Sequence, residues 1–313
     1  MVPGSGSAVG VVTGSTLIES PPHILIAGCG YLGRRAGHRW QRRGAKISVV
    51  TRSKSKAAEL AQAGFEPIIC DLAQRQILSL PDVDTVLWSV GFDRPAGRSR
   101  EMIWIDGLQH LLQQLPSTVG RFLYVSSTGV YGSASGGTVS ESTAPQPASE
   151  SGKCCLRAEK MLQRTFSDTD SSVSLTILRM AGMYGPGRLL RRISDLRSGI
   201  PLPGPAESYL NLIHIDDAVT AVAELAPCED VPLLNAVNAG TLTRKEYYGE
   251  LARIVGAPVP VFDESDTLVR GGNKRVISEV RTLLTLNFQF DDVKAGLRDA
   301  VKRGTEKGRE SSF

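Results

Sequence analysis

The stretch His23-Ile-Leu-Ile-Ala-Gly28-Cys-Gly30-Tyr-Leu-Gly33 decides the fold of this chain. Its apolar start predicts a buried strand, and the pattern after the glycines predicts a helix that runs to about Arg43. In this strand–turn–helix order, Gly28-x-Gly30-x-x-Gly33 is the fingerprint of a dinucleotide site, whereas a plain strand–helix turn is the alternative. Gly28 permits the tight turn, Gly30 lets a pyrophosphate approach the backbone, and Gly33 lets the helix pack closely on the strand.

The overall composition favours a globular protein with a small anionic ligand. The 313 residues suggest about two domains, or one large domain with an added lobe. Apolar residues make up 41% of the chain, and the net charge is +4. The basic residues are scattered or lie near the glycine turn, which predicts a small-molecule substrate and argues against nucleic acid.

Cysteine usage and hydropathy predict a cytoplasmic protein. The five cysteines are odd in number and lack metal-ligand spacing, so we expect a reducing compartment and no metal site. No apolar run approaches the roughly 18 residues of a membrane span. Residues 1–22 are rich in Gly, Ser and Pro and carry no charged segment before an apolar core, which predicts a flexible tail and not a signal peptide.

Alternating strand and helix patterns predict an α/β fold. The expected strands and helices alternate, which indicates a parallel sheet covered on both faces, the doubly wound Rossmann type. Ligands of such sheets bind at the carboxyl ends of the strands. We expect strands at 23–27, 46–51, 66–70, 85–90, 121–126 and 174–179, and helices at 54–63, 100–115 and about 152–166.

After Arg179 the chain becomes rich in turns, as in Gly182-Met-Tyr-Gly-Pro-Gly187. We therefore divide it into a dinucleotide-binding domain at 23–180 and a smaller C-terminal α/β substrate lobe at 181–300 that is interleaved with the sheet domain. Residues 301–313 are predicted to be a polar tail that frays.

Five segments along the chain carry motifs in a fixed order: Gly28–Gly33, Cys70–Leu72, Tyr124–Gly132, Leu178–Arg188 and Asn211–Asp217. Together they resemble the short-chain dehydrogenase/reductase superfamily, in its extended branch of NAD-dependent epimerases and dehydratases. A later segment, Asn273-Lys-Arg-Val-Ile-Ser, resembles an atypical subgroup of that branch.

One departure from the family pattern bears on activity. The family's catalytic pair is a Tyr followed four residues later by a Lys, but no Tyr-x-x-x-Lys occurs in this chain. Anchoring on Gly152, Leu156 and Ala158-Glu159 places Ser151 at the Tyr position and Cys155 at the Lys position. A serine hydroxyl is a far weaker acid than a phenol, so the usual proton relay is expected to be missing.

The candidate residues fall into three sets, each with a structural alternative. The resemblance assigns Ser127 as catalytic, to orient a substrate oxygen, although it could instead satisfy the backbone at a strand end. Tyr131 and Tyr184 could instead be packing residues, Asp71 a helix cap, and Arg188 a solvated charge. The cofactor set is Gly28, Gly30, Tyr31, Leu32, Gly33, Arg52, Asp71, Leu72, Ser89, Val90, Gly91 and Arg179. The substrate set is Ser126, Thr128, Tyr131, Tyr184 and Arg188.

The residues after the second expected strand favour NADP over NAD. No acid stands at 51–54 to bind a ribose 2′-OH, and Arg52 can pair with a phosphate. Arg34 and Arg35 in the first helical turn oppose the helix dipole unless an anion lies near. The alternative is that these arginines are solvated surface charges.

These features predict an NADP-dependent reductase or epimerase-like enzyme acting on a small carbonyl, hydroxyl or nucleotide-sugar substrate. The alternative is a catalytically silent NAD(P)-binding regulator or assembly factor, which the missing Tyr and Lys favour. His214 is expected to be structural, and Asp216 or Asp217 a helix cap. The resemblance also implies a homodimer formed through two helices of the sheet domain.

Overall fold

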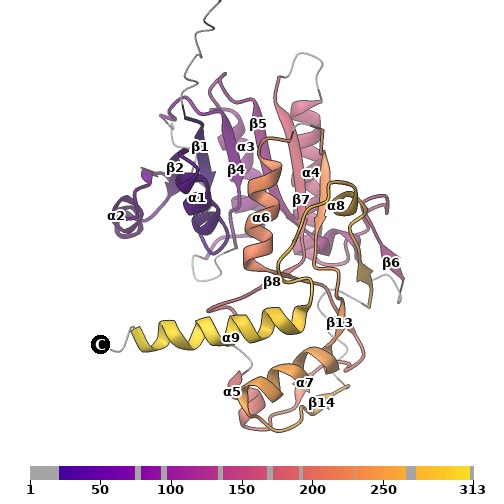
Figure 1. The fold of residues 1–313 in the computed structure, drawn as a ribbon. Coiled ribbons are helices and arrows are strands. Elements are labelled where there is room, and N and C mark those ends of the chain that lie inside the picture. The colour runs from indigo at the N-terminus through magenta and orange to yellow at the C-terminus, as the bar shows by residue number, and fades with distance from the viewer. Residues whose placement is uncertain are drawn as a thin grey trace, which may run out of the picture.

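The computed structural model consists of a sheet domain above a smaller lobe (Figure 1). It describes residues 21–74, 79–92, 97–132, 137–167, 172–189, 193–228, 230–265 and 273–310, with 305–310 described by backbone only. The predicted flexible tail at 1–22 therefore lies almost wholly outside the described residues.

A parallel sheet of seven strands forms the centre of the upper domain, in the order β12-β7-β5-β4-β1-β2-β3. The strand order reverses between β1 and β4, as in a doubly wound Rossmann sheet. The fold class expected from the sequence is therefore confirmed. The strands are β1 (His23–Ala27), β2 (Lys46–Thr51), β3 (Glu66–Ile69), β4 (Thr85–Trp88), β5 (Arg121–Ser127), β7 (Ser174–Met180) and β12 (Leu233–Ala236).

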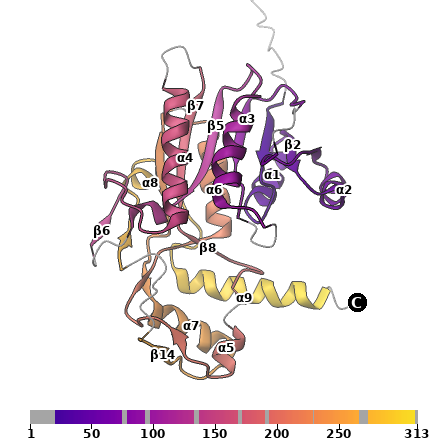
Figure 2. The same ribbon diagram turned by 180° about the vertical axis from the view of Figure 1, so that it is seen from behind.

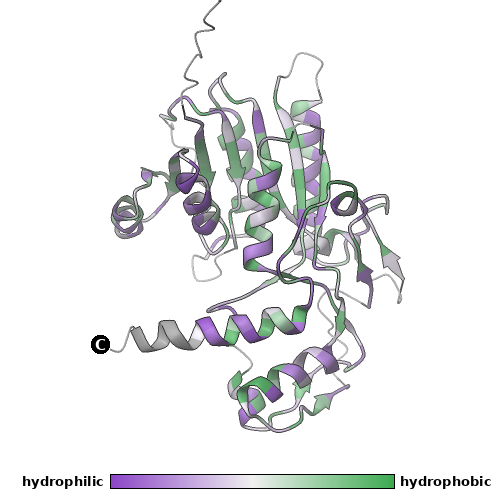
Figure 3. Ribbon diagram, in the orientation of Figure 1, coloured by the Kyte–Doolittle hydropathy of each residue, from purple (hydrophilic) through white to green (hydrophobic). Residues whose placement is uncertain are grey.

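Helices cover both faces of this sheet. The helices α1 (Gly33–Arg42), α2 (Lys54–Gln62) and α6 (Ile215–Leu225) pack on one face, and α3 (Gly107–Leu112) and α4 (Glu150–Phe166) pack on the other, as the two opposite views show (Figures 1 and 2). Neighbouring residues of β1 point to opposite faces: Ile24 and Ile26 join the core under α1, whereas Leu25 and Ala27 join the core under α3. This double burial explains why the central strands are mainly apolar (Figure 3).

The lobe has its own core. Its centre is built from Tyr184, Leu196, Leu251 and Leu297, all buried.

The other α-helices of the described residues, in the lobe or beside the sheet, are α5 (Ile193–Arg197), α7 (Arg244–Val255), α8 (Glu279–Leu283) and α9 (Val293–Glu310). The short strands are β6 (Thr138–Val139), β8 (Gly182–Tyr184), β9 (Leu202–Pro203), β10 (Tyr209–Leu210), β11 (Leu212–His214), β13 (Leu242–Thr243), β14 (Phe262–Asp263) and β15 (Arg275–Val276).

The expected elements match the observed ones closely, with three differences. The helix expected at 100–115 contains a π-helical segment, Met102–Asp106, before α3 begins. The seventh strand, β12, was not predicted, and with α6 it returns from the later part of the chain to the sheet domain. The predicted polar tail at 301–313 includes the end of α9, which continues to Glu310. Among the described residues, no helix has the length and apolar character needed to cross a membrane.

Candidate functional site

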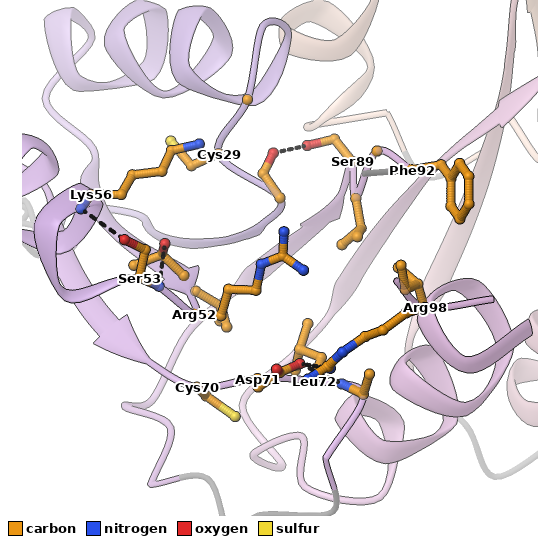
Figure 4. A pocket seen from close by; sticks show the side chains of 18 residues that line it. Cys29, Arg52, Ser53, Lys56, Cys70, Asp71, Leu72, Ser89, Phe92 and Arg98 are labelled. Carbon is orange, nitrogen blue, oxygen red and sulfur yellow. Dashed lines mark hydrogen bonds and ion pairs between the residues drawn. The ribbon is translucent and has the colours of Figure 1, made fainter. Parts of the chain in front are cut away.

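A cavity of about 500 Å³ lies at the carboxyl edge of the sheet, where the strand order reverses (Figure 4). Its walls come from the ends of β1, β2, β3 and β4, which is where doubly wound sheets hold their ligands. Of the predicted cofactor set, the residues that line it are Gly28, Gly30, Arg52, Asp71, Leu72, Ser89, Val90 and Gly91.

The glycine turn is built as the sequence predicts. Gly28 has φ +93°, and a Cβ there would lie 2.5 Å from the backbone of Ser89. A Cβ on Gly33 would lie 2.5 Å from the Gly28 carbonyl, so this glycine is needed for close packing. A Cβ on Gly30 would meet no atom within 4 Å. Gly30 is therefore not needed for packing, and it borders open space.

The turn also presents backbone donors that the protein leaves without acceptors. In the part of the chain that the structure describes, the N–H groups of Tyr31 and Leu32 donate no hydrogen bond, while the Gly30 N–H donates to the Gly28 carbonyl at 2.9 Å. Such donors at the start of a helix, beside open space, form an anion site. The turn therefore fits a pyrophosphate.

One end of the cavity is basic. Arg52 follows β2, and its guanidinium points into the cavity (Figure 4). The next residue, Ser53, caps α2 by accepting a hydrogen bond from the Lys56 N–H at 3.3 Å. Lys56 also lines the cavity, so two cations stand beside the N-terminus of α2. This arrangement suits a phosphate group.

The other predicted arginines do not reach this end. Arg34 forms an ion pair with Glu59, and Arg35 donates to the Tyr31 carbonyl at 2.8 Å. Neither of them lines the cavity. The suggestion that they hold the anion is therefore not supported by their placement, since each has a protein partner instead.

The cavity wall also carries a carboxylate, which follows the strand next to β2. Asp71 follows β3 and forms an ion pair with Arg98, with 2.5 Å between Oδ1 and Nη1. The Ala73 N–H donates to the same oxygen at 3.2 Å, which gives Asp71 a local capping role as well. Asp71 thus lies in the cavity wall, and no helix of the described residues begins at its turn.

The end of β5 and the turn after it form a second group of predicted residues, apart from the cavity wall. Ser127 ends β5 and is half-buried, and its hydroxyl accepts a hydrogen bond from the Gly129 N–H at 3.1 Å. Thr128 begins the 3-10 helix Thr128–Tyr131 and is buried. The structural alternative for Ser127 is therefore realised, and its O–H remains able to donate to a ligand.

Three further predicted residues belong to a buried network and not to the cavity wall. Ser126 donates to Glu159 at 2.5 Å, and Arg179 holds the same carboxylate through Nε and Nη2 at 3.1 and 2.8 Å. Arg179 also donates to the Tyr131 hydroxyl, which donates to Asn235 Oδ1 at 2.8 Å. A buried guanidinium needs a carboxylate partner, and Arg179 finds it on α4 and not on a ligand.

Helix α4 brings Ser151 and Cys155 to this second group. A Cβ on Gly152 would lie 2.6 Å from the Gly129 carbonyl, so the start of α4 packs directly on the turn after Ser127. Cys155 is buried, and burial raises the pKa of its thiol to about 12. Lys153 is exposed and pairs with Glu150 at 2.7 Å. In this arrangement neither Cys155 nor Lys153 supplies a cation beside Ser151.

The remaining predicted residues connect the glycine turn to the lobe. The Tyr31 hydroxyl donates to the Pro186 carbonyl at 3.1 Å, and the guanidinium of exposed Arg188 lies 5.1 Å from the centre of the Tyr31 ring. Leu32 is buried in the core under α1. Tyr184 is buried and donates to the Val293 carbonyl at 3.4 Å. None of Tyr31, Leu32, Gly33, Tyr184 and Arg188 lines the cavity. The sequence places two more arginines close after Arg188, Arg191 and Arg192, and both lie outside the described residues.

His214 has a structural position, as expected. It is fully buried, caps α6 by accepting from the Asp216 N–H at 3.3 Å, and lies 3.5 Å from Asp299. Asp217 accepts from Asn238 and from the Gln289 and Phe290 N–H groups. His214, Asp216 and Asp299 have the proximity of metal ligands, but Arg303 forms ion pairs with both carboxylates. That guanidinium supplies the positive charge an ion would bring.

Several cavity residues could not be assigned from the sequence. Lys56 and Arg98 carry charge into the cavity, and Phe92 and Ile103 supply apolar surface. Lys56 has a detectable signal, because it lies in the first turn of a helix that follows an expected strand end. Arg98 has no local signal, since its partner Asp71 is 27 residues away.

Comparisons with known proteins agree with this architecture. Residues 24–240 match the model of the NAD dependent epimerase/dehydratase family. Protein YeeZ of Escherichia coli K12 is 26% identical over 274 residues, which cover 85% of this chain and 95% of that protein. A 3-diazoavenalumate denitrifying reductase of a Streptomyces species is 25% identical over 257 residues, or 76% of this chain and 83% of that one. The structure of MoeE5 with UDP-glucose and NAD superposes with a TM-score of 0.74 at 22% identity, covering 91% of this chain and 99% of that one.

Proposed function

Because this chain belongs to the NAD dependent epimerase/dehydratase family, we propose that it is an oxidoreductase that binds NADP in the cavity at the carboxyl edge of its sheet. The observation that carries the proposal is the glycine turn. Its Tyr31 and Leu32 N–H groups donate to no described residue, and Gly30 borders open space. A pyrophosphate bound there gains two hydrogen bonds from backbone groups already held in place.

Arg52 and Lys56 support NADP over NAD. Both line the cavity at the end of β2, where the ribose of a dinucleotide lies in this fold. No carboxylate follows β2 to accept from a 2′-hydroxyl, since residues 51–54 read Thr-Arg-Ser-Lys. Two cations and a helix N-terminus favour a 2′-phosphate.

The reaction we propose is reduction of a small carbonyl compound, or epimerisation, through oxidation and reduction, of a hydroxyl compound or a nucleotide sugar. When bound, the nicotinamide supplies the hydride chemistry. Ser127 ends the strand next to β4, whose end lines the cavity, and this position supports a role for its O–H in orienting a substrate oxygen. The similarity to a reductase and to a structure that holds a nucleotide sugar supports both substrate classes.

A non-catalytic NAD(P)-binding regulator is the second candidate, and one observation favours it. In the alignment anchored on Gly152, Ser151 stands where the family has its acid, and Cys155, a buried thiol whose pKa burial raises, stands where the family has its cation. Loss of general acid catalysis costs about 10²–10⁴-fold and does not abolish hydride transfer, so we place the enzyme first.

Titration with NADPH and NADH tests the cofactor proposal, with nicotinamide fluorescence and thermal shift as readouts. We expect NADPH to bind more tightly than NADH, and Arg52→Asp to reverse that order. Arg43→Asp is the matched control, because Arg43 pairs with Glu224 on α6, away from the cavity. If Arg52→Asp binds NADPH and NADH with the same affinities as the wild type, the contact with the 2′-phosphate lies elsewhere. A screen of carbonyl compounds then distinguishes the two candidate functions. Oxidation of bound NADPH by any of these compounds indicates an enzyme, and its absence favours the regulator.

A further inference from the structure

Arg100 is a cation to which the described residues offer no carboxylate. Its guanidinium carbon lies 4.1 Å from the centre of the Phe92 ring, and its Nε is buried without a hydrogen-bond acceptor. In the described part of the chain, the guanidinium forms no hydrogen bond or ion pair. An aromatic face attracts a guanidinium, but it does not replace the acceptors that the cation loses when it leaves water. The charge of Arg100 is therefore incompletely compensated by the described residues.

Phe92 connects Arg100 to the cavity. It follows β4 and lines the cavity, where Figure 4 shows its ring on the same side as Ser89. The ring also meets the edge of Trp104, from the π-helical segment, with 6.0 Å between the ring centres. The Trp104 N–H in turn donates to the Val90 carbonyl at 2.9 Å. Phe92 and Trp104 thus form a fixed support beside the cavity, and the guanidinium of Arg100 lies on it.

Helix α4 connects Arg100 to the second group of predicted residues. The next residue along the chain, Glu101, pairs with Arg157 on α4 at 2.9 Å. Burial raises the pKa of the Cys155 thiol on the same helix, and the nearby charge of Arg100 opposes this effect. The start of α4 packs on the turn after Ser127. Arg100 therefore lies beside both the cavity wall and the group that contains the proposed substrate contact.

The surrounding charges indicate which kind of anion suits Arg100. Of its described neighbours, Arg98 already pairs with Asp71, and Arg157 already pairs with Glu101. A single guanidinium balances one negative charge, whereas a diphosphate carries a larger charge and would need further cations. The planar fork of a guanidinium also matches the two oxygens of a carboxylate. A monocarboxylate therefore fits this position better than the diphosphate of a nucleotide sugar.

We infer that Arg100 is a specificity-determining residue that pairs with a carboxylate of the substrate, so that the substrate is an oxo acid or the corresponding hydroxy acid. The inference rests on the proposed function, because it names the substrate class of the same site. Among the reactions proposed above, it favours reduction of a small carbonyl compound over epimerisation of a nucleotide sugar.

The test compares a carboxylate with its neutral counterpart on the full chain saturated with NADP⁺, using isothermal titration calorimetry. Benzoylformate and its methyl ester share the ring and the ketone but differ in charge. A hydrogen bond to a charged group changes affinity by about tenfold or more, so we expect the wild type to prefer benzoylformate by at least about that factor. Arg100→Met should abolish the preference, because methionine keeps an apolar contact with Phe92 but carries no charge.

Two variants and one further probe sharpen the test. Arg157→Met is the matched control, because it removes a neighbouring cation that already has a carboxylate partner, and it should keep the preference. Arg100→Lys keeps the charge but loses the planar fork, so it should keep only part of the preference. UDP-glucose is the further probe. If it binds more tightly than benzoylformate and loses that advantage in Arg100→Met, Arg100 holds a phosphate and the inference is wrong.

The remaining outcomes separate the inference from the proposed function. The inference is overturned if the wild type shows no preference for benzoylformate over its ester, or if Arg100→Met keeps that preference. It is also overturned if Arg100→Met weakens NADP⁺ binding and leaves the preference unchanged, because Arg100 would then contact the cofactor. If the wild type binds neither NADP⁺ nor NADPH, the proposed function fails as well. Binding of NADP⁺ without a preference for the carboxylate overturns only the inference.

Discussion

Gly28 and Gly30 lie two residues apart in one turn, yet adding a side chain at each should have different effects, on stability at Gly28 and on NADPH binding at Gly30. Gly30→Val should leave the protein folded and abolish NADPH binding. Gly28→Ala should destabilise the fold. The difference follows from the surroundings, because a Cβ on Gly30 meets nothing within 4 Å whereas a Cβ on Gly28 lies 2.5 Å from three backbone atoms.

The magnitudes can be worked from this geometry. At Gly28, φ of +93° costs an L-residue about 1–2 kcal/mol. Overlap with Ser89 and Val90 adds about 1–3 kcal/mol. The free energy of unfolding should therefore fall by about 2–5 kcal/mol, which corresponds to roughly 5–15 °C in Tm for a chain of this size.

At Gly30 the free energy of unfolding should change by no more than about 0.5 kcal/mol. The valine side chain fills the space beside the Tyr31 and Leu32 N–H groups, so the pyrophosphate loses both bonds. At about 1.5–3 kcal/mol for each charge-assisted bond, affinity should fall at least about 100-fold.

Thermal unfolding and NADPH fluorescence titration of the two variants give both quantities. Wild-type affinity in Gly30→Val would refute the placement of the pyrophosphate at this turn. If the Tm of Gly30→Val were as low as that of Gly28→Ala, the space beside Gly30 would not be open.

Three further predictions follow from the second group of residues and the lobe. Ser127→Ala should lower kcat by at least about tenfold on any carbonyl substrate that the screen identifies, whereas Ser126→Ala, whose partner is Glu159, should lower Tm instead; an unchanged kcat removes Ser127 from the mechanism. Glu159→Gln leaves the Arg179 guanidinium buried without its carboxylate and should lower the free energy of unfolding, measured with denaturant, by about 3–5 kcal/mol. Adding Arg179→Met should restore part of that loss, and additive losses in the double variant would contradict the pairing. Burial lowers the pKa of His214 to about 4, whereas the imidazole in the unfolded chain takes up a proton near its ordinary pKa of about 6.5. The free energy of unfolding should therefore fall by up to about 3 kcal/mol as the pH is lowered from 6.5 to 4. Urea titrations of the wild type and of His214→Asn should diverge over that range, and parallel curves would contradict the prediction.

The sheet and its cofactor edge could be predicted because their signals are local. The apolar run before Gly28, the glycine spacing and the helix after it lie within twenty residues. Asp71 could be found for the same reason, since it directly follows an expected strand, and so could Ser89, which lies near the end of another.

Other features depend on partners distant in the sequence. Arg179 was expected at the cofactor, but Glu159 on α4 and Tyr131 take its guanidinium. The strand β12 is only four residues long and includes the polar Asn235, whose burial is explained by contacts with Tyr131, Glu141 and Ile277. Residues after 300 looked like a polar tail because the apolar anchors of α9, such as Leu297 and Ala300, precede them.

The position of β12 has a consequence for how this protein is made. The strand pairs with β7 and closes one side of the sheet, yet it lies more than fifty residues later in the chain. During synthesis β7 therefore emerges as an unpaired edge with apolar neighbours and stays so until the lobe's first half has followed. A fragment that ends before residue 233 should aggregate, and a nascent chain stalled there should depend on a chaperone. The late strand couples completion of the nucleotide domain to synthesis of the lobe.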